Sequence, residues 1–231
     1  MRLPSSVPSS SSLSSSSSSD SVSHPLLKKM FGRLTFYPSL VYNVVLERLA
    51  YRQWYSRLDD TIILGALPWR HLIPEVTYSY LWENCNPCLI QQLIEKEKVG
   101  GVVSMNESFE LKYGVPSKEE WKTNGVDFLQ LSTPDIFHAP TQENLDMGVE
   151  FIRRFEGSGQ SVYVHCKAGR TRSATLVGCY LMQKHNWDAK TAVDFIKSKR
   201  HHVLLHTPQW NAMRIFSDRQ KPSPSLAGVE P

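Results

Sequence analysis

One stretch of nine residues, HCKAGRTRS at 165–173, joins an apolar run at 161–164 to a helical pattern at 174–184. These patterns predict a strand, a tight loop and the N-terminus of a helix that meet at one thiol. Such a loop points successive backbone N–H groups at a common centre, and the helix dipole adds positive potential there. That field favours a bound phosphate and the thiolate form of Cys166, which is a nucleophile. Arg172 is placed to bind two phosphate oxygens, so the stretch predicts cleavage of phosphate esters.

The residues of this stretch also have simpler interpretations. Cys166 could be an inert buried thiol at a strand end, and Arg172 a solvent-facing arginine at a helix start. Neither interpretation explains why both residues fall in one short loop around Gly169. Lys167 and Arg170 add two cations, which either face solvent or favour a substrate with more than one anionic group. The residues expected to contact the substrate are Lys167, Ala168, Gly169, Arg170 and Thr171.

Three further residues are expected to support the chemistry. An acid must protonate the leaving alkoxide, and Asp135 follows a predicted strand, where α/β proteins place ligand-binding loops. Taken alone, an aspartate after Pro134 would be interpreted as a turn residue. Ser173 can hydrogen-bond the cysteine sulfur and ease its departure, or cap the helix, or do both. His165 can brace the loop by hydrogen-bonding its backbone, or it is a structural histidine at a strand end.

Strand and helix patterns alternate from residue 58 onward. Apolar runs predict strands at 61–64, 100–105, 126–131 and 161–164. Helical spacing and capping residues predict helices at 88–98, from Thr141, at 174–184, at 189–200 after Asp188, and from Thr207 to about residue 217. This alternation predicts an α/β fold: a single cysteine-phosphatase domain at 58–219, with a central, mostly parallel sheet of four to five strands flanked by helices.

The composition is that of an ordinary α/β protein. The 231 residues are 41% hydrophobic and 21% charged. The net charge of +4 is compatible with an anionic substrate or a membrane surface and does not by itself indicate binding to nucleic acid. Four cysteines are too few for a disulfide framework and indicate reduced thiols. Cys85 and Cys88 form a C-x-x-C pair, but no second pair of zinc ligands is evident, so two incidental cysteines are favoured over a redox pair. We expect no metal and no cofactor.

Both ends of the chain differ from the predicted domain. Residues 1–29 form a serine-rich extension that should be disordered, either as a plain extension or as part of a targeting segment. Residues 30–57 carry a broad apolar face interrupted by charges, which favours an amphipathic membrane-contact or targeting helix over a helix docked on the domain. This segment lacks the uncharged run that spans a bilayer. Residues 220–231 should be a disordered tail.

Several short motifs, together with the loop, resemble those of a known family. They are FYP at 36–38, WY at 54–55, LGALP at 64–68, MNE at 105–107, LST at 131–133 and VYVHCKAGR at 162–170. The chain resembles the mitochondrial phosphatidylglycerophosphate phosphatases, in the dual-specificity branch of the protein tyrosine phosphatase superfamily, over about residues 31–218. It departs from them in an apparent insertion at about 77–88 and in the loop 106–110, where Ser108 and Phe109 replace the expected glutamate and tyrosine.

The resemblance implies a fold, a substrate and three roles. Cys166 would be the nucleophile, Arg172 the phosphate-binding residue and Asp135 the general acid. The implied reaction is dephosphorylation of phosphatidylglycerophosphate to phosphatidylglycerol, a step of cardiolipin synthesis, at the matrix face of the inner mitochondrial membrane. A dual-specificity phosphoprotein or phosphoinositide phosphatase is the enzymatic alternative, and a phosphate-binding adaptor is the non-enzymatic one. The expected partner is a phospholipid in a membrane that the protein contacts peripherally, and not nucleic acid.

Overall fold

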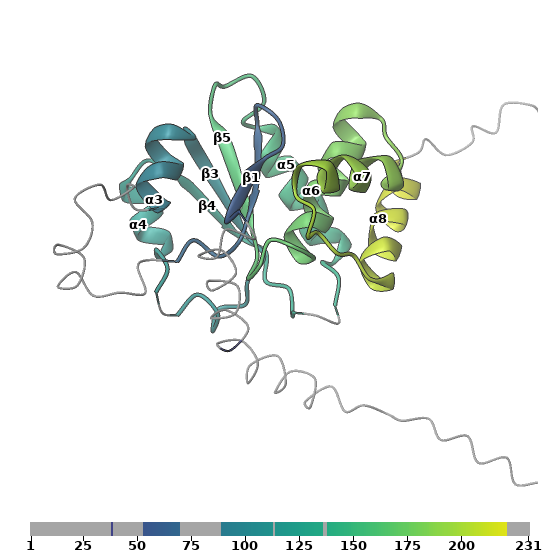
Figure 1. Ribbon diagram of the computed structural model, residues 1–231, viewed down its shortest axis with the longest axis horizontal. Helices are drawn as coiled ribbons and strands as arrows, with labels where there is room; N and C mark the ends of the chain where they lie inside the picture. The colour runs from purple at the N-terminus through teal and green to yellow at the C-terminus, as the bar shows by residue number, and fades with distance from the viewer. Residues whose placement is uncertain (1–37, 39–52, 70–88, 113, 136–137, 221–231) are drawn as a thin grey trace, which may run out of the picture.

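The computed structural model describes residues 53–69, 89–112, 114–135 and 138–220, together with Pro38. Their centre is a five-stranded sheet with the strand order β1-β2-β5-β3-β4 (Figure 1). The strands are β1 (Tyr55–Arg57), β2 (Ile62–Gly65), β3 (Val99–Ser104), β4 (Asp127–Gln130) and β5 (Ser161–His165). All neighbouring strands run parallel except β1 and β2, which are antiparallel. The predicted α/β fold with a mostly parallel sheet is confirmed.

Strand β1 is the one strand of this sheet that the sequence did not predict. It has three residues and no alternation of apolar and polar side chains, so it carries no strand pattern. It pairs with β2 across a short turn in which Asp59 Oδ1 accepts hydrogen bonds from the N–H groups of Thr61 and Ile62, at 2.8 and 2.7 Å. The sheet therefore begins before residue 58, where the predicted domain begins.

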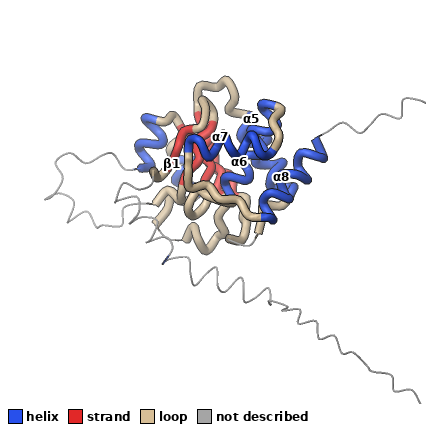
Figure 2. The backbone as a smooth tube through the Cα atoms, turned by 45° about the vertical axis from the view of Figure 1, so that its right-hand side comes forward, coloured by secondary structure: helices blue, strands red, loops and turns tan. Residues whose placement is uncertain are grey.

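The helices cover both faces of the sheet (Figure 2). They are α3 (Leu89–Gln91), which continues as the π-helix η1 (Gln92–Lys96), α4 (Lys118–Thr123), α5 (Gln142–Arg153), α6 (Arg172–His185), α7 (Ala189–Lys199) and α8 (Thr207–Gln220). The predicted caps are confirmed, since Thr141 and Asp188 accept hydrogen bonds from the N–H groups of Asn144 and Thr191 at 3.2 and 2.7 Å. Helix α4 was not predicted, although a capping box of Ser117 and Glu120 begins it.

Two apolar layers hold the sheet between the helices. Ile62 and Leu64 on β2 belong to the larger cluster, which α5 to α8 complete, whereas Ile63 packs into the smaller one with Leu93 and Trp121. Successive strand residues point to opposite faces, so a short apolar run is buried on both sides. The carboxyl ends of the parallel strands consequently meet at one edge of the sheet, which is where α/β proteins bind ligands.

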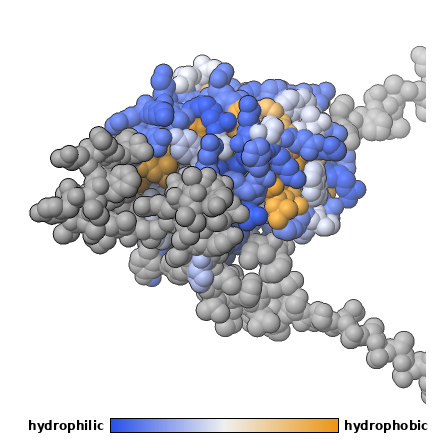
Figure 3. Space-filling view, viewed as in Figure 1, coloured by the Kyte–Doolittle hydropathy of each residue, from blue (hydrophilic) through white to orange (hydrophobic). Residues whose placement is uncertain are grey.

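The described surface is mainly hydrophilic in the view of Figure 3, with apolar residues in small patches. The exposed large apolar side chains among the described residues are Met147, Leu204 and Ile215. No helix in the described ranges is long and apolar enough to cross a membrane. The predicted serine-rich extension, most of the 30–57 segment, the 77–88 insertion with Cys85 and Cys88, and residues 221–231 of the tail lie outside the described residues.

Candidate active site

The predicted loop connects β5 to α6, so the strand–loop–helix arrangement is confirmed. Gly169 lies at its centre with φ of +62°, a conformation that favours glycine. A Cβ atom on this residue would also overlap the carbonyl group of Gly65, at the end of β2. Glycine is therefore required here for two reasons, the backbone conformation and the close approach of the neighbouring strand.

The loop carbonyls are held on the outer side of the loop by the main chain around them. The carbonyls of residues 165, 167 and 170 accept hydrogen bonds from the N–H groups of Met105, Leu67 and Leu204 at 2.9, 3.3 and 3.2 Å. In a planar trans peptide the C=O and N–H bonds point in opposite directions. Carbonyls that face outward therefore turn the following N–H groups toward the inside of the loop, where they can receive an anion.

Cys166 is buried at the start of this loop, and its thiol has an altered acidity. Burial raises the pKa of the thiol, but the Arg172 guanidinium and the hydroxyl of Ser173 lower it by more, so that the net pKa lies below the ordinary value. Ser173 Oγ lies 3.2 Å from Cys166 Sγ. Ser173 lies inside α6, and the N-cap of this helix is Thr171. The role of the Ser173 side chain is therefore the contact with the cysteine sulfur and not helix capping.

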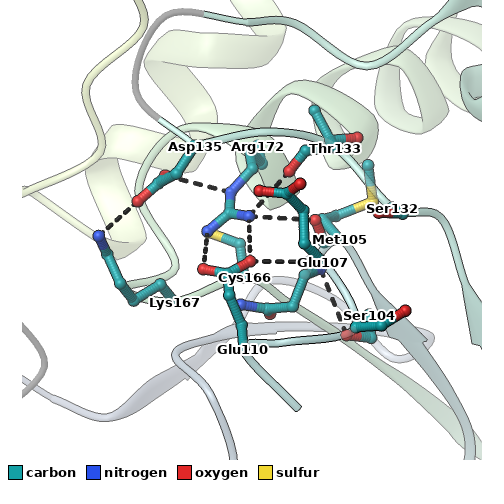
Figure 4. A network of polar contacts seen from close by, with 12 residues as sticks. Ser104, Met105, Glu107, Glu110, Ser132, Thr133, Asp135, Cys166, Lys167 and Arg172 are labelled. Atoms are coloured by element: carbon teal, nitrogen blue, oxygen red, sulfur yellow. Dashed lines mark hydrogen bonds and ion pairs between the residues drawn. The ribbon is translucent and has the colours of Figure 1, made fainter. Parts of the chain in front are cut away.

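Arg172 is fully buried, and a carboxylate occupies one edge of its guanidinium (Figure 4). Nη1 and Nη2 donate to the two oxygens of Glu110 at 2.7 and 3.0 Å. Nη1 also donates to the carbonyls of Thr133 and Met105 at 2.9 and 3.3 Å. Four acceptors thus fix the plane of the guanidinium, and the edge formed by Nε and Nη2 is the one that can bind phosphate oxygens.

Asp135 lies between two cations at the mouth of the loop (Figure 4). Its Oδ1 is 3.2 Å from Arg172 Nε, and its Oδ2 forms an ion pair with Lys167 Nζ. The Asp135 side chain is 16% exposed, whereas that of Arg172 is fully buried, so the aspartate stands on the solvent side of the guanidinium. The structure thus brings together the three residues predicted to be catalytic and Lys167.

The side chains of three other predicted residues, His165, Arg170 and Thr171, contact the protein around the loop. His165 is buried and neutral, because burial lowers the pKa of its ring to about 3. An interaction with the backbone of Cys166 raises the pKa of the ring by less than burial lowers it, which agrees with a ring that braces the loop, although its geometry falls outside the hydrogen-bond criteria met elsewhere among the described residues. The ring also stacks on Tyr163, with centroids 5.6 Å apart. Arg170 Nε and Thr171 Oγ1 donate to the carbonyls of His202 and Leu204 at 3.0 and 3.1 Å. These two side chains therefore connect the loop to the segment before α8.

Glu110 is the site residue that sequence reasoning missed. It belongs to the loop 106–110 after β3, in which Ser108 and Phe109 depart from the family pattern. The carboxylate is buried, and its Oε2 also accepts a hydrogen bond from the N–H group of Glu107 at 2.7 Å. The available signal was the pair of acids, Glu107 and Glu110, that follows a buried strand at the same sheet edge as Arg172.

Comparison with known proteins agrees with this geometry. The model of the dual specificity phosphatase catalytic domain matches residues 85–219. The chain belongs to the dual specificity phosphatase family. It is 40% identical over 194 residues to the phosphatidylglycerophosphatase and protein-tyrosine phosphatase 1 of Homo sapiens, covering 83% of this chain and 88% of the relative. It is also 37% identical over 183 residues to the phosphatidylglycerophosphate phosphatase PTPMT1 of Arabidopsis thaliana, covering 79% of this chain and 48% of that protein.

A solved structure of a related phosphatase has a similar fold. The crystal structure of PTPMT1 in complex with PI(5)P matches with a TM-score of 0.63 and 38% identity, covering 72% of this chain and 96% of the other. This dual specificity phosphatase is therefore a close homologue of phosphatidylglycerophosphatases, and its catalytic domain is that of a cysteine-based phosphatase. In the described part of the chain, no group of three or more His, Cys, Asp or Glu side chains is arranged to hold a metal ion.

Replacing Glu110 with glutamine should impair this phosphatase strongly. The variant keeps one acceptor for the guanidinium of Arg172 but removes the buried negative charge opposite it. We expect turnover to fall about 100-fold, because a small misplacement of a binding group has this effect, and the free energy of unfolding to fall by about 3 kcal/mol. Steady-state kinetics and urea unfolding measure the two effects. Glu150→Gln, on the exposed face of α5, is the matched control, and equal losses in both variants would contradict the expectation.

Proposed function

We propose that the protein hydrolyses phosphate monoesters through a cysteinyl-phosphate intermediate. The Cys166 thiolate attacks phosphorus, so that a P–S bond forms while the bond to the leaving oxygen breaks. Asp135 transfers its proton to that oxygen, and the product leaves as an alcohol. Arg172 binds two phosphate oxygens through Nε and Nη2, and the loop amides bind the others. The observation that carries this proposal is the position of Cys166 inside a loop whose carbonyls face outward, with Arg172 and Ser173 lowering its pKa.

The second step releases phosphate and restores the enzyme. Water attacks phosphorus, the Asp135 carboxylate accepts a proton from that water, and the P–S bond breaks. The departing sulfur becomes a thiolate again, and the hydroxyl of Ser173, 3.2 Å away, donates a hydrogen bond to it. Over both steps one water is consumed, and one alcohol and one phosphate are released. Asp135 ends in the protonation state in which it began.

The substrate that we propose is phosphatidylglycerophosphate, which would be converted to phosphatidylglycerol. The names of the human and Arabidopsis relatives support this choice, since both are phosphatidylglycerophosphate phosphatases at 37–40% identity. Lys167, which forms an ion pair with Asp135 beside the loop, adds a cation that favours an anionic substrate. The reaction would take place in cardiolipin synthesis, with the protein in contact with the matrix face of the inner mitochondrial membrane.

Two substrate comparisons test this choice. The purified full-length chain should release phosphate from phosphatidylglycerophosphate in mixed micelles at least about tenfold faster than from a phosphotyrosine peptide, judged by kcat/KM. The structure of PTPMT1 with PI(5)P makes phosphatidylinositol 5-phosphate in the same micelles the second comparison. A faster reaction with the peptide would support a protein phosphatase, and a faster reaction with the inositol lipid would support a phosphoinositide phosphatase. Either result would overturn the proposed substrate.

The proposed role of Asp135 has its own signature. In Asp135→Asn the leaving alkoxide receives no proton, so kcat for an alkyl phosphate should fall about 10²–10³-fold. The fall should be much smaller for p-nitrophenyl phosphate, because nitrophenolate leaves without a proton. The decrease of rate at high pH, where a general acid loses its proton, should also disappear. Asp127→Asn, at the exposed start of β4, is the matched control. An unchanged pH–rate profile in Asp135→Asn would assign the acid to another residue.

A further inference from the structure

A second buried arginine contacts the phosphate-binding loop from its outer side. Arg200 is the C-terminal cap of α7 and is 2% exposed. Its Nε donates to the carbonyl of Gly169 at 2.9 Å, and its Nη2 donates to the carbonyl of Ala168 at 3.3 Å. These two carbonyls accept no main-chain hydrogen bond from the described residues, so Arg200 is their partner within that part of the chain.

The same guanidinium also holds the chain that leads into β1. Nη1 donates to the carbonyl of Gln53 at 3.0 Å and lies 3.4 Å from Ser56 Oγ, and Nη2 donates to the carbonyl of Trp54 at 3.3 Å. The Arg200 side chain thus hydrogen-bonds two segments, around Gln53 and around Gly169, that are more than 100 residues apart in the sequence. Only a planar fork with donors in several directions can reach both sets of acceptors, since an ammonium group has its three donors on one atom.

The two loop contacts determine where the next amides point. Because all peptide bonds in the described residues are trans, fixing the carbonyls of Ala168 and Gly169 on the Arg200 side turns the N–H groups of Gly169 and Arg170 to the opposite side. That side is the interior of the loop, next to Cys166. We propose that Arg200 is a positioning residue: it orients these two amides toward the phosphate and the thiolate, and it ties residues 53–56 to the loop. The inference rests on the proposed function only in that the loop binds the phosphate.

The charge of Arg200 acts in the same direction as its hydrogen bonds. A buried cation behind the loop adds positive potential to a site that holds a thiolate and a phosphate dianion. The carbonyl contacts also polarise the two peptide units, which makes their N–H groups better donors. Both effects favour anions at the site. A defect at Arg200 should therefore weaken oxyanion binding and raise the pH at which Cys166 becomes reactive.

The first experiment compares Arg200→Lys with Arg57→Lys. Arg57 is a matched control because it also donates to main-chain carbonyls and ties β1 to the sheet, but at the end away from the loop. Tungstate is the oxyanion probe, with its dissociation constant taken from the tungstate-dependent rise in Tm. The rate of Cys166 alkylation by iodoacetamide is followed against pH. We expect Arg200→Lys to bind tungstate at least tenfold more weakly and to shift the midpoint of alkylation to higher pH, while Arg57→Lys leaves both unchanged.

Several outcomes would overturn the inference. Tungstate affinity within twofold of the wild type, an unchanged alkylation midpoint, or the same changes in both variants would each do so. If Arg200→Lys does not fold, wild-type protein gives a separate test, since bound tungstate should slow hydrogen exchange at the amides of Gly169 and Arg170. Unchanged exchange at both amides would overturn the inference. A wild-type chain that neither binds tungstate nor hydrolyses any phosphate monoester would instead overturn the proposed function.

Discussion

Cys166→Ser should abolish hydrolysis of every phosphate monoester, with a fall in kcat of at least about 10⁴-fold. A serine hydroxyl has nearly the same size as the thiol, so the loop around it should stay folded. Its pKa is far above that of the thiol, and neither Arg172 nor Ser173 can bring it into the anionic form at neutral pH. The measurement is phosphate release under steady-state conditions, with tungstate binding as a check that the loop is intact.

The control for this variant is Cys179, which lies on α6. Cys179 is buried in the apolar core, and burial raises the pKa of its thiol, so it is an uncharged packing residue. Cys179→Ala should retain turnover within about threefold, with a modest loss of stability from the small cavity. If Cys166→Ser kept wild-type turnover, the cysteinyl-phosphate mechanism would be wrong. The same conclusion would follow if Cys179→Ala were the inactive variant.

Arg172→Lys should reduce kcat/KM by about 10³-fold or more, although the charge is kept. Lysine cannot present the planar edge of Nε and Nη2 to two phosphate oxygens. It also cannot satisfy both oxygens of Glu110 and the carbonyl of Thr133 at once, so the buried carboxylate is left with fewer donors. We expect both a weaker affinity for tungstate and a slower chemical step, because in the proposed mechanism the guanidinium binds the phosphate in both steps.

Arg219→Lys is the matched control for this second variant. Arg219 also pairs with a carboxylate, that of Asp146, but on the exposed side of α8 and α5. This pair is solvent-accessible, so replacing the guanidinium should change stability and turnover very little. Comparing Tm with kcat separates folding from chemistry in Arg172→Lys. A variant with wild-type tungstate affinity and wild-type turnover would remove Arg172 from the proposed mechanism.

Local patterns were sufficient for most of the fold. Apolar runs predicted β2, β3, β4 and β5 to within about two residues. Strands β2, β3 and β5 are buried along their whole length, whereas β4, at the edge of the sheet, is only partly buried. Thr141 and Asp188 predicted the beginnings of α5 and α7, because a capping side chain acts on N–H groups only three residues away. The helix α6 begins at Arg172, two residues before its predicted start. The start was not recognised because the N-cap, Thr171, makes no side-chain capping hydrogen bond.

Residues that act through distant contacts could not be predicted in this way. Glu110 is 62 residues from Arg172 in the sequence, and no local pattern pairs a glutamate after β3 with an arginine at the start of α6. Arg200 looks like any basic residue at the end of a helix, where a cation is favoured by the helix dipole. Strand β1 is three residues long and depends on its pairing with β2.

The sequence by itself was enough to predict the residues of the proposed chemistry: a cysteine, a glycine and an arginine within one short strand-to-helix loop, together with Asp135 after the neighbouring strand. The loop residues were identifiable because they are contiguous in the sequence. Only the tertiary structure decided how the loop is held: Glu110 fixes the plane of Arg172, and Arg200 holds two carbonyls from the far side. The physical reason is that a buried charged group needs partners from several directions, and the fold brings these from distant parts of the chain.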